Sequence, residues 1–219
     1  MEFEKVFVTG SDKNNEWMLD WFLTNFKMHN STPIIFADFG VSDSMKKWVI
    51  EYFDKVIDMP KPSKTAWFLK PKTMIEVSKI SNHVCWIDTD CHVLKPIDDI
   101  FKYTAHNKLS MVRDEPWTNR FKTTWHNSGI VAFKGCPKIL KDWEETARSS
   151  NERGDQEVLH SMLSGDELRR RIYIEDIPNV YNWLRLQIID NQDTVNKKVM
   201  HWTGKKGNDV IKEMIKNGR

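Results

Sequence analysis

The sequence predicts an α/β fold with a mainly parallel central sheet, helices on both faces and a mixed C-terminal half. In the first half, short apolar runs typical of buried strands alternate with stretches of helical periodicity, an order that favours parallel strands joined by covering helices. In the second half this alternation gives way to longer strands, two helices and short strands. No internal repeat or linker rich in Pro, Gly or Ser interrupts residues 1–219, so we expect one domain.

The elements follow from the spacing of apolar residues. The first half is predicted to contain a strand at Val6–Val8, a helix at Glu16–Met28, a strand at Ile34–Phe36, a helix at Ser42–Tyr52 capped by Ser42, a strand at Val56–Ile57, a helix from about Lys72 to Ile80, and a strand at His83–Ile87. The second half is predicted to contain strands at Ser110–Val112 and Gly129–Phe133, helices at Pro137–Ser149 and Asp155–Leu163, short strands near Ile172, Val180 and Val199, and a basic helix near Asn208–Lys216.

Composition narrows the class of protein. A net charge of +2 is too small to favour nucleic-acid or membrane binding by charge alone. The run Arg169–Arg171 has no interleaved aromatics and is expected to be a solvated loop. Three cysteines without zinc spacing, a charged start at Met1–Lys5 and no apolar run near the ~18 residues of a membrane span indicate a soluble, cytoplasmic protein. Ten tryptophans favour a binding cleft.

The segment Trp86–Asp90 carries the strongest chemical signal. It places Asp88 and Asp90 at the end of a buried apolar strand, where charges are costly unless a cation pairs with them. Oxygen ligands at this spacing suit Mg²⁺ or Mn²⁺, which leave other coordination positions to phosphate and water. The alternative is a plain strand-to-turn junction in which Asp88 caps the turn and Asp90 is solvated.

A second polar cluster occupies Met200–Gly207, which we expect to be a loop. His201 is a neutral metal-ligand type, the glycines allow close approach of the backbone to phosphate, and Lys205 and Lys206 can neutralise it. A turn with a surface histidine is the alternative. His92, two positions beyond Asp90, competes with His201 as a third ligand, and the glycines and lysines favour His201.

Six segments then occur in the order of a known family. They are Phe7–Asn14, Phe68–Pro71, Trp86–Leu94, His126–Val131, Gly154–Leu159 and His201–Gly204. Together they resemble the GT-A-fold glycosyltransferases, most closely the retaining family-8 transferases of the glycogenin and bacterial galactosyltransferase type. The resemblance implies a single GT-A (Rossmann-like) domain, with a nucleotide-binding half at about 1–95 and, at about 96–219, an acceptor-side half that includes the C-terminal metal and phosphate loop.

The resemblance also implies roles for individual residues. Asp88, Asp90 and His201 match the manganese ligands. The residues implied to bind the donor are Thr9, Gly10, Asp12 and Asn14 at uracil and ribose, Lys70 and Thr89 beside the donor, Ser128 at the sugar, and Gly204, Lys205 and Lys206 at the pyrophosphate. Asn127 would hold the sugar, and Asp155 and Gln156 would lie beside the reacting sugar, so these three are the candidate catalytic residues.

One departure from the family pattern concerns the phosphate contact. The family writes HxxGxxKPW, whereas this chain has Gly207 at the lysine position and no tryptophan after it. Lys205 or Lys206 must therefore substitute. Because side chains two apart share a face in an extended loop, the two lysines should be unequal, and Lys206, nearest the family position, is favoured.

These assignments also have structural alternatives. Asp12 and Asn14 are common turn residues, Asp155 can be a helix N-cap, Asn127–Gly129 can be a turn before a strand, and Lys70 can be solvated.

The predicted function is metal-dependent transfer of a hexose from a nucleotide sugar, a UDP-sugar by resemblance, to an unidentified acceptor with retention. One alternative is a nucleotidyltransferase or pyrophosphatase, which usually needs a Gly-rich loop where Thr9–Asp12 has one glycine. The other is an inactive nucleotide-sugar-binding module.

Overall fold

The computed structural model describes residues 1–60, 65–164 and 166–218. Its strands are β1 (Phe3–Ser11), β2 (Ile34–Asp38), β3 (Lys55–Asp58), β4 (Ser81–Ile87), β5 (Cys91–Val93), β6 (Leu109–Arg113), β7 (His126–Lys134), β8 (Ile174–Asp176), β9 (Trp183–Leu184) and β10 (Val199–His201). Its α-helices are α1 (Leu19–His29), α2 (Asp43–Tyr52), α3 (Lys70–Ser78), α4 (Glu115–Phe121), α5 (Lys138–Ser149), α6 (Asp155–Leu163), α7 (Glu167–Tyr173), α8 (Arg185–Ile189) and α9 (Gly204–Lys216).

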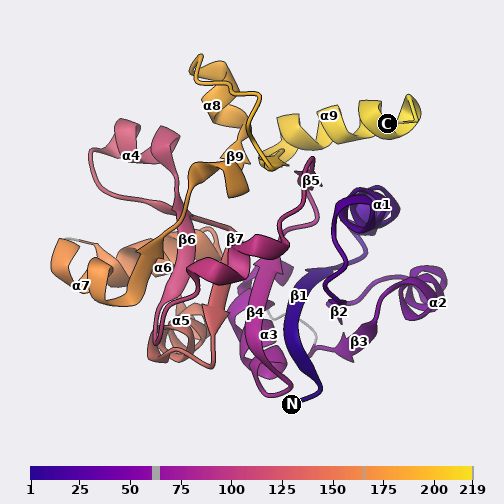
Figure 1. Cartoon of the computed structure of the whole chain (residues 1–219), viewed down its shortest axis with the longest axis horizontal. Coiled ribbons are helices and arrows are strands. Elements are labelled where there is room, and N and C mark those ends of the chain that lie inside the picture. Colours follow the sequence, from indigo (N-terminus) through magenta and orange to yellow (C-terminus); the bar gives the residue numbers. More distant parts are fainter. Residues whose placement is uncertain (61–64, 165, 219) are drawn as a thin grey trace.

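The central sheet has seven strands in the order β3-β2-β1-β4-β7-β6-β8. The pairs β2–β3, β1–β2, β1–β4 and β6–β8 are parallel, whereas β7 runs antiparallel to both of its neighbours. Figure 1 shows α1 and α2 on one side of this sheet and α5 and α6 on the other. The expected α/β fold with a mostly parallel sheet is therefore confirmed.

Successive side chains of the central strands point to opposite faces of the sheet and so contribute to two apolar cores, one on each face. On β1, Phe7 enters the core formed with α1, while Val6 and Val8 enter the core formed with α3, α5 and α6. On β4, Ile87 enters the first core and Trp86 the second. Because both faces are buried there, the inner parts of these strands, such as Val6–Val8 and Val84–Ile87, are continuous apolar runs.

A second, three-stranded sheet in the order β5-β10-β9 places residues that are far apart in the sequence side by side. β10 pairs antiparallel with β5, with His201 opposite Cys91, and parallel with β9. In Figure 1, β5, β9 and the start of α9 lie together above one end of the central strands. The turn after β4 and the C-terminal segment therefore meet at that end.

Several expected elements are wrong in type or position. Ile172 belongs to α7, whose N-cap Asp166 accepts a hydrogen bond from the backbone N–H of Arg169, so the arginine run is helical and not a loop. Val180 lies in a 3₁₀ turn, and the strand follows at β9. The segment from Gly204 to Gly207 is the first turn of α9 and not a loop. The Ser42 cap of α2 is confirmed by its hydrogen bond with the backbone N–H of Met45.

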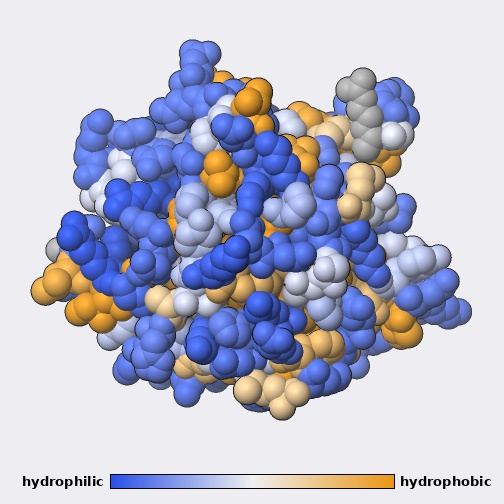
Figure 2. Space-filling model, viewed as in Figure 1, coloured by the Kyte–Doolittle hydropathy of each residue, from blue (hydrophilic) through white to orange (hydrophobic). Residues whose placement is uncertain are grey.

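The visible surface in Figure 2 is mainly hydrophilic, with an apolar patch over α7 that matches the exposed Leu168 and Ile172. In the described part of the chain, no helix is both long and apolar enough to cross a bilayer. Cys85, Cys91 and Cys136 are free thiols, and the first two are buried.

Candidate active site

Two adjoining cavities open where β1 and β4 end, the edge at which open α/β sheets usually bind ligands. The first cavity, about 460 Å³ in volume, lies between the end of β1, the residues after β4 and the start of α9. The second, also about 460 Å³, lies between β7 and the starts of α4, α6 and α8. Lys70, Asp88 and Asp90 line both cavities and therefore lie at their boundary.

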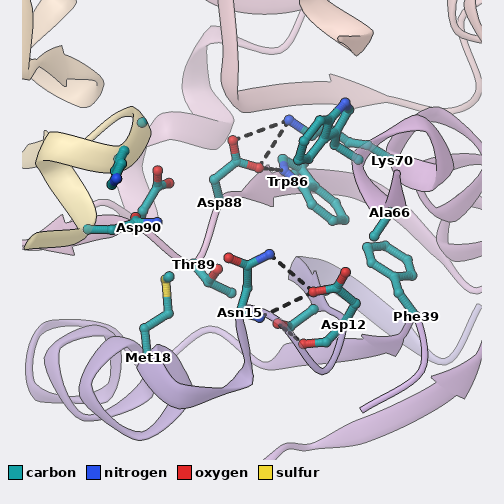
Figure 3. A pocket seen from close by; sticks show the side chains of 16 residues that line it. Asp12, Asn15, Met18, Phe39, Ala66, Lys70, Trp86, Asp88, Thr89 and Asp90 are labelled. Atoms are coloured by element: carbon teal, nitrogen blue, oxygen red, sulfur yellow. Dashed lines mark hydrogen bonds and ion pairs between the residues drawn. The ribbon is translucent and has the colours of Figure 1, made fainter. Parts of the chain in front are cut away.

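The carboxylate of Asp12 organises the turn after β1. It accepts the backbone N–H groups of Asn14 and Asn15 at 3.1 and 3.2 Å and also both of their side-chain amides. Asp12 and Asn15 line the first cavity, and Figure 3 shows them on one of its walls. Asn14 is exposed and is not among the described residues that line this cavity. The hydrogen bonds of Asp12 and Asn14 are thus those expected of turn residues.

An aromatic wall faces this turn. Phe39 stacks nearly parallel on Trp86, with ring centroids 6.3 Å apart and an interplanar angle of 13°, and Gly10 lies directly beneath Phe39. Gly10, Phe39 and Trp86 all line the first cavity. Thr9, in contrast, is fully buried in β1 and is not among the described residues lining either cavity.

Asp88 is anchored by the residues around it. It accepts a hydrogen bond from the indole nitrogen of Trp86 at 2.6 Å, and its backbone N–H donates to the carbonyl of Gly129 at 2.8 Å. Burial raises the pKa of Asp88 above its ordinary value and Asp90 adds to this, although Lys70 opposes it. Figure 3 shows the carboxylate of Asp88 facing both Lys70 and Trp86, with Asp90 and the buried Thr89 nearby.

His201 reaches the same point from β10. Its Nε2 lies 3.0 Å from Oδ1 of Asp90 and 3.9 Å from Oδ2 of Asp88. Gly129 makes room for the ring, because a Cβ there would lie 2.1 Å from Cε1 of His201. Burial favours the neutral ring, but the two carboxylates outweigh it and raise the pKa of His201. The structure therefore brings together the two aspartates and the late histidine.

The donor set at this point fits a hard divalent cation. Two carboxylates and one imidazole nitrogen converge, and a cation would neutralise charges that are costly to bury unpaired. Cys91 has a ligand atom in the same group as Asp90 and His201, within 4.8 Å. Burial raises the pKa of the Cys91 thiol far above its ordinary value, and sulfur ligands suit softer metals than Mg²⁺ or Mn²⁺. Asp88 is not in this group, and its link to the site is the 3.9 Å between its Oδ2 and Nε2 of His201. His92 is also outside the group, and it packs on Trp21 with ring centroids 5.2 Å apart.

Lys70 is buried, with only 2% of its surface exposed, so the solvated alternative is wrong. Its Nζ lies 3.0 Å from Asp88 and 3.2 Å from Asp155, and it donates to the backbone carbonyl and the hydroxyl of Ser128 at 3.0 and 3.2 Å. Burial alone would lower the pKa of Lys70, but Asp155 and Asp88 together raise it above its ordinary value. One ammonium group thus joins β4, β7 and α6.

Hydrogen-bonded side-chain amides line part of the second cavity. The side-chain oxygen of Gln156 accepts from the side chain of Asn127 at 2.9 Å and from the backbone N–H of Ser128 at 3.2 Å. Asp114 accepts from the amide of Gln156 at 3.2 Å, and burial raises the pKa of its carboxyl. Asn127 and Ser128 belong to β7, so the alternative of a turn at these residues is wrong. The N-cap of α6 is Gly154, so the N-cap alternative for Asp155 is wrong as well.

The start of α9 replaces the expected phosphate loop. Gly204 and Lys205 line the first cavity, whereas Lys206 is not among its described lining residues. Gly207 packs against the preceding backbone, because a Cβ there would lie 1.8 Å from the carbonyl oxygen of Trp202. The position that carries lysine in the resembled pattern therefore has no room for a side chain in this structure.

Several residues of the site were not predicted. Asp114 caps α4 by accepting from the backbone N–H of Trp117 at 3.0 Å, and the sequence Asp114-Glu115-Pro116 is a helix-start signal that could have indicated it. Asn182 contacts Nδ1 of His201 through its side chain, and no sequence motif around it indicates this role. Trp67 and Trp117 line the second cavity, and Trp67 lines the first as well.

No protein-family model matches the sequence, and a comparison with curated proteins gives no match. Solved structures give clear matches. The chain is similar to the galactosyltransferase LgtC in complex with donor and acceptor sugar analogs (12% identity, TM-score 0.64, covering 97% of this chain and 95% of that one). It is also similar to a glycosyltransferase involved in the glycosylation of the major capsid of PBCV-1 (12% identity, TM-score 0.59, 97% and 99%).

A third similar structure is the apo form of the glycosyltransferase GlyE from Streptococcus pneumoniae TIGR4 (13% identity, TM-score 0.66), where the match covers 99% of this chain and 64% of that one. The chain therefore has the GT-A fold of glycosyltransferases. The resemblance noted from the six sequence segments is confirmed at the level of the fold.

Proposed function

We propose that this chain is a metal-dependent glycosyltransferase that moves a hexose from a UDP-sugar to a hydroxyl acceptor with retention. The observation that carries the proposal is the convergence of Asp88, Asp90 and His201 at the boundary of two cavities. A nucleotide sugar has its diphosphate between two larger parts, so it matches this arrangement. The shared fold of solved glycosyltransferases supports the reaction class.

In this proposal the nucleoside occupies the first cavity. The base lies against the apolar wall of Phe39 and Trp86, and the turn held by Asp12 offers Asn15 for polar contacts. The diphosphate lies between the carboxylate pair and the start of α9, where backbone N–H groups and Lys205 favour negative charge.

The hexose occupies the inner part of the second cavity. Asn127 and Gln156 offer amide groups to its hydroxyls, and Asp155 is held beside it by Lys70. When bound by Asp88, Asp90 and His201, Mn²⁺ or Mg²⁺ would stabilise the negative charge of the leaving diphosphate. Lys70 holds the carboxylates of Asp88 and Asp155 in place through its two ion pairs.

The test combines binding with product analysis. A thermal-shift panel of nucleotide sugars with and without Mn²⁺ should show a Mn²⁺-dependent rise with one UDP-hexose, because a ligand at 100 times its dissociation constant stabilises by about 2.7 kcal/mol. Slow hydrolysis should then release free sugar and UDP. Nucleoside monophosphate as product would favour a nucleotidyltransferase or pyrophosphatase, and binding without products would favour an inactive module. Proton NMR of the product's anomeric signal tests retention.

The helical start of α9 leads us to expect the opposite order for the two lysines. Successive side chains on a helix point about 100° apart, and only Lys205 of the two is among the described residues that line the first cavity. Lys205→Ala should weaken UDP binding at least about tenfold, since a charge-assisted hydrogen bond contributes roughly 1.5–3 kcal/mol. Lys206→Ala, the matched control, should leave it nearly unchanged. Calorimetric titration of UDP with Mn²⁺ decides; a larger loss for Lys206 would contradict the placement of the diphosphate.

The acceptor is expected to meet Trp117 at the outer wall of the second cavity. Trp117 lines this cavity and is fixed edge-on by Trp125, with ring centroids 4.8 Å apart, so it presents a rigid apolar face of the kind on which sugar rings stack. Trp117→Ala should raise the KM for a saccharide acceptor about 3- to 10-fold and leave donor hydrolysis unchanged. Phe121→Ala removes another aromatic of the same cluster that is not among the described lining residues. Equal effects of the two variants on KM would argue against this acceptor position.

A further inference from the structure

A buried chain of side-chain hydrogen bonds links the proposed metal ligand His201 to the sugar side of the site. Nδ1 of His201 lies 2.9 Å from Oδ1 of Asn182, and Nδ2 of Asn182 donates to Oδ1 of Asn127 at 2.8 Å. Asn127 in turn donates to Gln156 at 2.9 Å, and Gln156 donates to Asp114 at 3.2 Å. Asn182 is completely buried and is the link between His201 and Asn127.

Two backbone N–H groups fix the direction of every bond in it. The N–H of Gly129 donates to Asn127 at 2.9 Å, so the atom of Asn127 at that position is its oxygen. The N–H of Ser128 likewise identifies the oxygen of Gln156. Because Asn127 turns its oxygen toward Asn182, the atom that Asn182 directs at it must be the NH₂ group. The oxygen of Asn182 then faces His201.

This direction determines which nitrogen of His201 is free for a cation. An amide oxygen only accepts hydrogen bonds, so Nδ1 of His201 must carry a proton. Nε2, the atom 3.0 Å from Asp90, is then the nitrogen whose lone pair can bind a metal. Rotating the ring by half a turn would leave the buried oxygen of Asn182 without a donor, which is costly.

We propose that Asn182 is a positioning residue with two separable roles. Its oxygen holds the proton on Nδ1 of His201 and so presents Nε2 to the metal. Its NH₂ group orients Asn127 and, through it, Gln156 for the donor sugar. The metal part of this inference rests on the proposed function, whereas the state of the His201 ring is a property of the chain itself.

Two substitutions separate the roles. Asn182→Asp keeps an oxygen that accepts from His201 but removes the NH₂ donor to Asn127. Asn182→Ala removes both. Asn30→Ala is a matched control, because Asn30 accepts from the backbone N–H of Ile97 at 2.8 Å and donates to the carbonyl of Phe26 at 2.9 Å, with neither of its partners at the site. Circular dichroism establishes that each variant is folded.

The first measurement uses the protein without metal or donor. Proton–nitrogen NMR of the imidazole rings should show a proton on Nδ1 of His201 that is protected from exchange in the wild type and in Asn182→Asp, and loses its protection in Asn182→Ala. Protection unchanged in Asn182→Ala would overturn the inference whether or not the chain is a transferase.

The second measurement is Mn²⁺ affinity by electron paramagnetic resonance of the free ion. Asn182→Ala should weaken Mn²⁺ binding by about 10- to 100-fold, the usual effect of losing the outer partner of a histidine ligand. Asn182→Asp should bind Mn²⁺ at least as well as the wild type but hydrolyse the donor more than about tenfold more slowly. Equal loss of Mn²⁺ affinity in both variants would reduce Asn182 to a packing role, and normal hydrolysis by Asn182→Asp would refute the link to Gln156. If the wild type neither binds Mn²⁺ nor hydrolyses a donor, the proposed function fails while the NMR result stands.

Discussion

Asp90→Asn is expected to lower metal-dependent donor turnover by more than about 100-fold while the protein remains folded. Asp90 offers a carboxylate oxygen 3.0 Å from Nε2 of His201, and a neutral amide at this position is a much weaker ligand for a divalent cation. Even the loss of an outer partner of a ligand costs roughly 10- to 100-fold, so losing the ligand itself should cost more. Turnover should be measured with saturating UDP-sugar over a range of Mn²⁺ concentrations.

Asp90 gives a cleaner test than Asp88. Asp88→Asn should also lose activity, but it removes a counter-ion of the buried Lys70 at the same time. Asp58→Asn is a suitable control because it makes the same change on a side chain that is 78% exposed. Full activity of Asp90→Asn with Mn²⁺ would show that the metal assignment is incorrect.

The fold was largely predictable because the apolar pattern of the central strands is strong. β2 and the inner parts of β1 and β4 are buried on both faces and are followed by turn-forming residues, and these signals depend on nearby residues alone. The elements near Ile172 and Val180 differ from the predicted strands because a few apolar residues in a row fit a strand, a short helix or a turn equally well.

The residues of the candidate site could be predicted only where they form a recognisable sequence motif. The pattern of Asp88 and Asp90 indicated a cation, but the partners that complete the site come from distant segments brought together by the second sheet and by α4. Asn182 is an ordinary asparagine in the sequence, and it becomes significant only when β9 and β10 place it against His201. The loop predicted around Lys205 is wrong because glycines also occur at helix starts: Gly204 begins α9, and Gly207 lets its first turn pack against the backbone of Trp202.

Lys70→Met is expected to destabilise the fold by about 3–5 kcal/mol at neutral pH, the usual cost of removing one partner of a buried ion pair. Lys70 lies 3.0 Å from Asp88 and 3.2 Å from Asp155, and its own side chain is 3% exposed, so its loss leaves the buried Asp155 and the partly buried Asp88 without their counter-ion. Urea denaturation of the wild type and the variant gives the difference directly. Lys46→Met is the control, because Lys46 pairs with Asp38 and Asp58 but is 44% exposed, and its loss should change the free energy of unfolding little.

The pH dependence of this loss identifies its cause. Burial already raises the folded-state pKa of Asp88, and removing Lys70, which lowers it, should raise this pKa further. A carboxyl whose folded pKa exceeds its unfolded value favours folding below the unfolded value, and this contribution is lost as pH rises through the folded pKa. The deficit of Lys70→Met should therefore be small near about pH 4 and grow toward neutrality. Mn²⁺ should reduce the deficit at neutral pH, because it supplies positive charge beside Asp88. A deficit that is the same at both pH values and indifferent to Mn²⁺ would mean that Lys70 acts through packing, and the electrostatic account of the site would have to be abandoned.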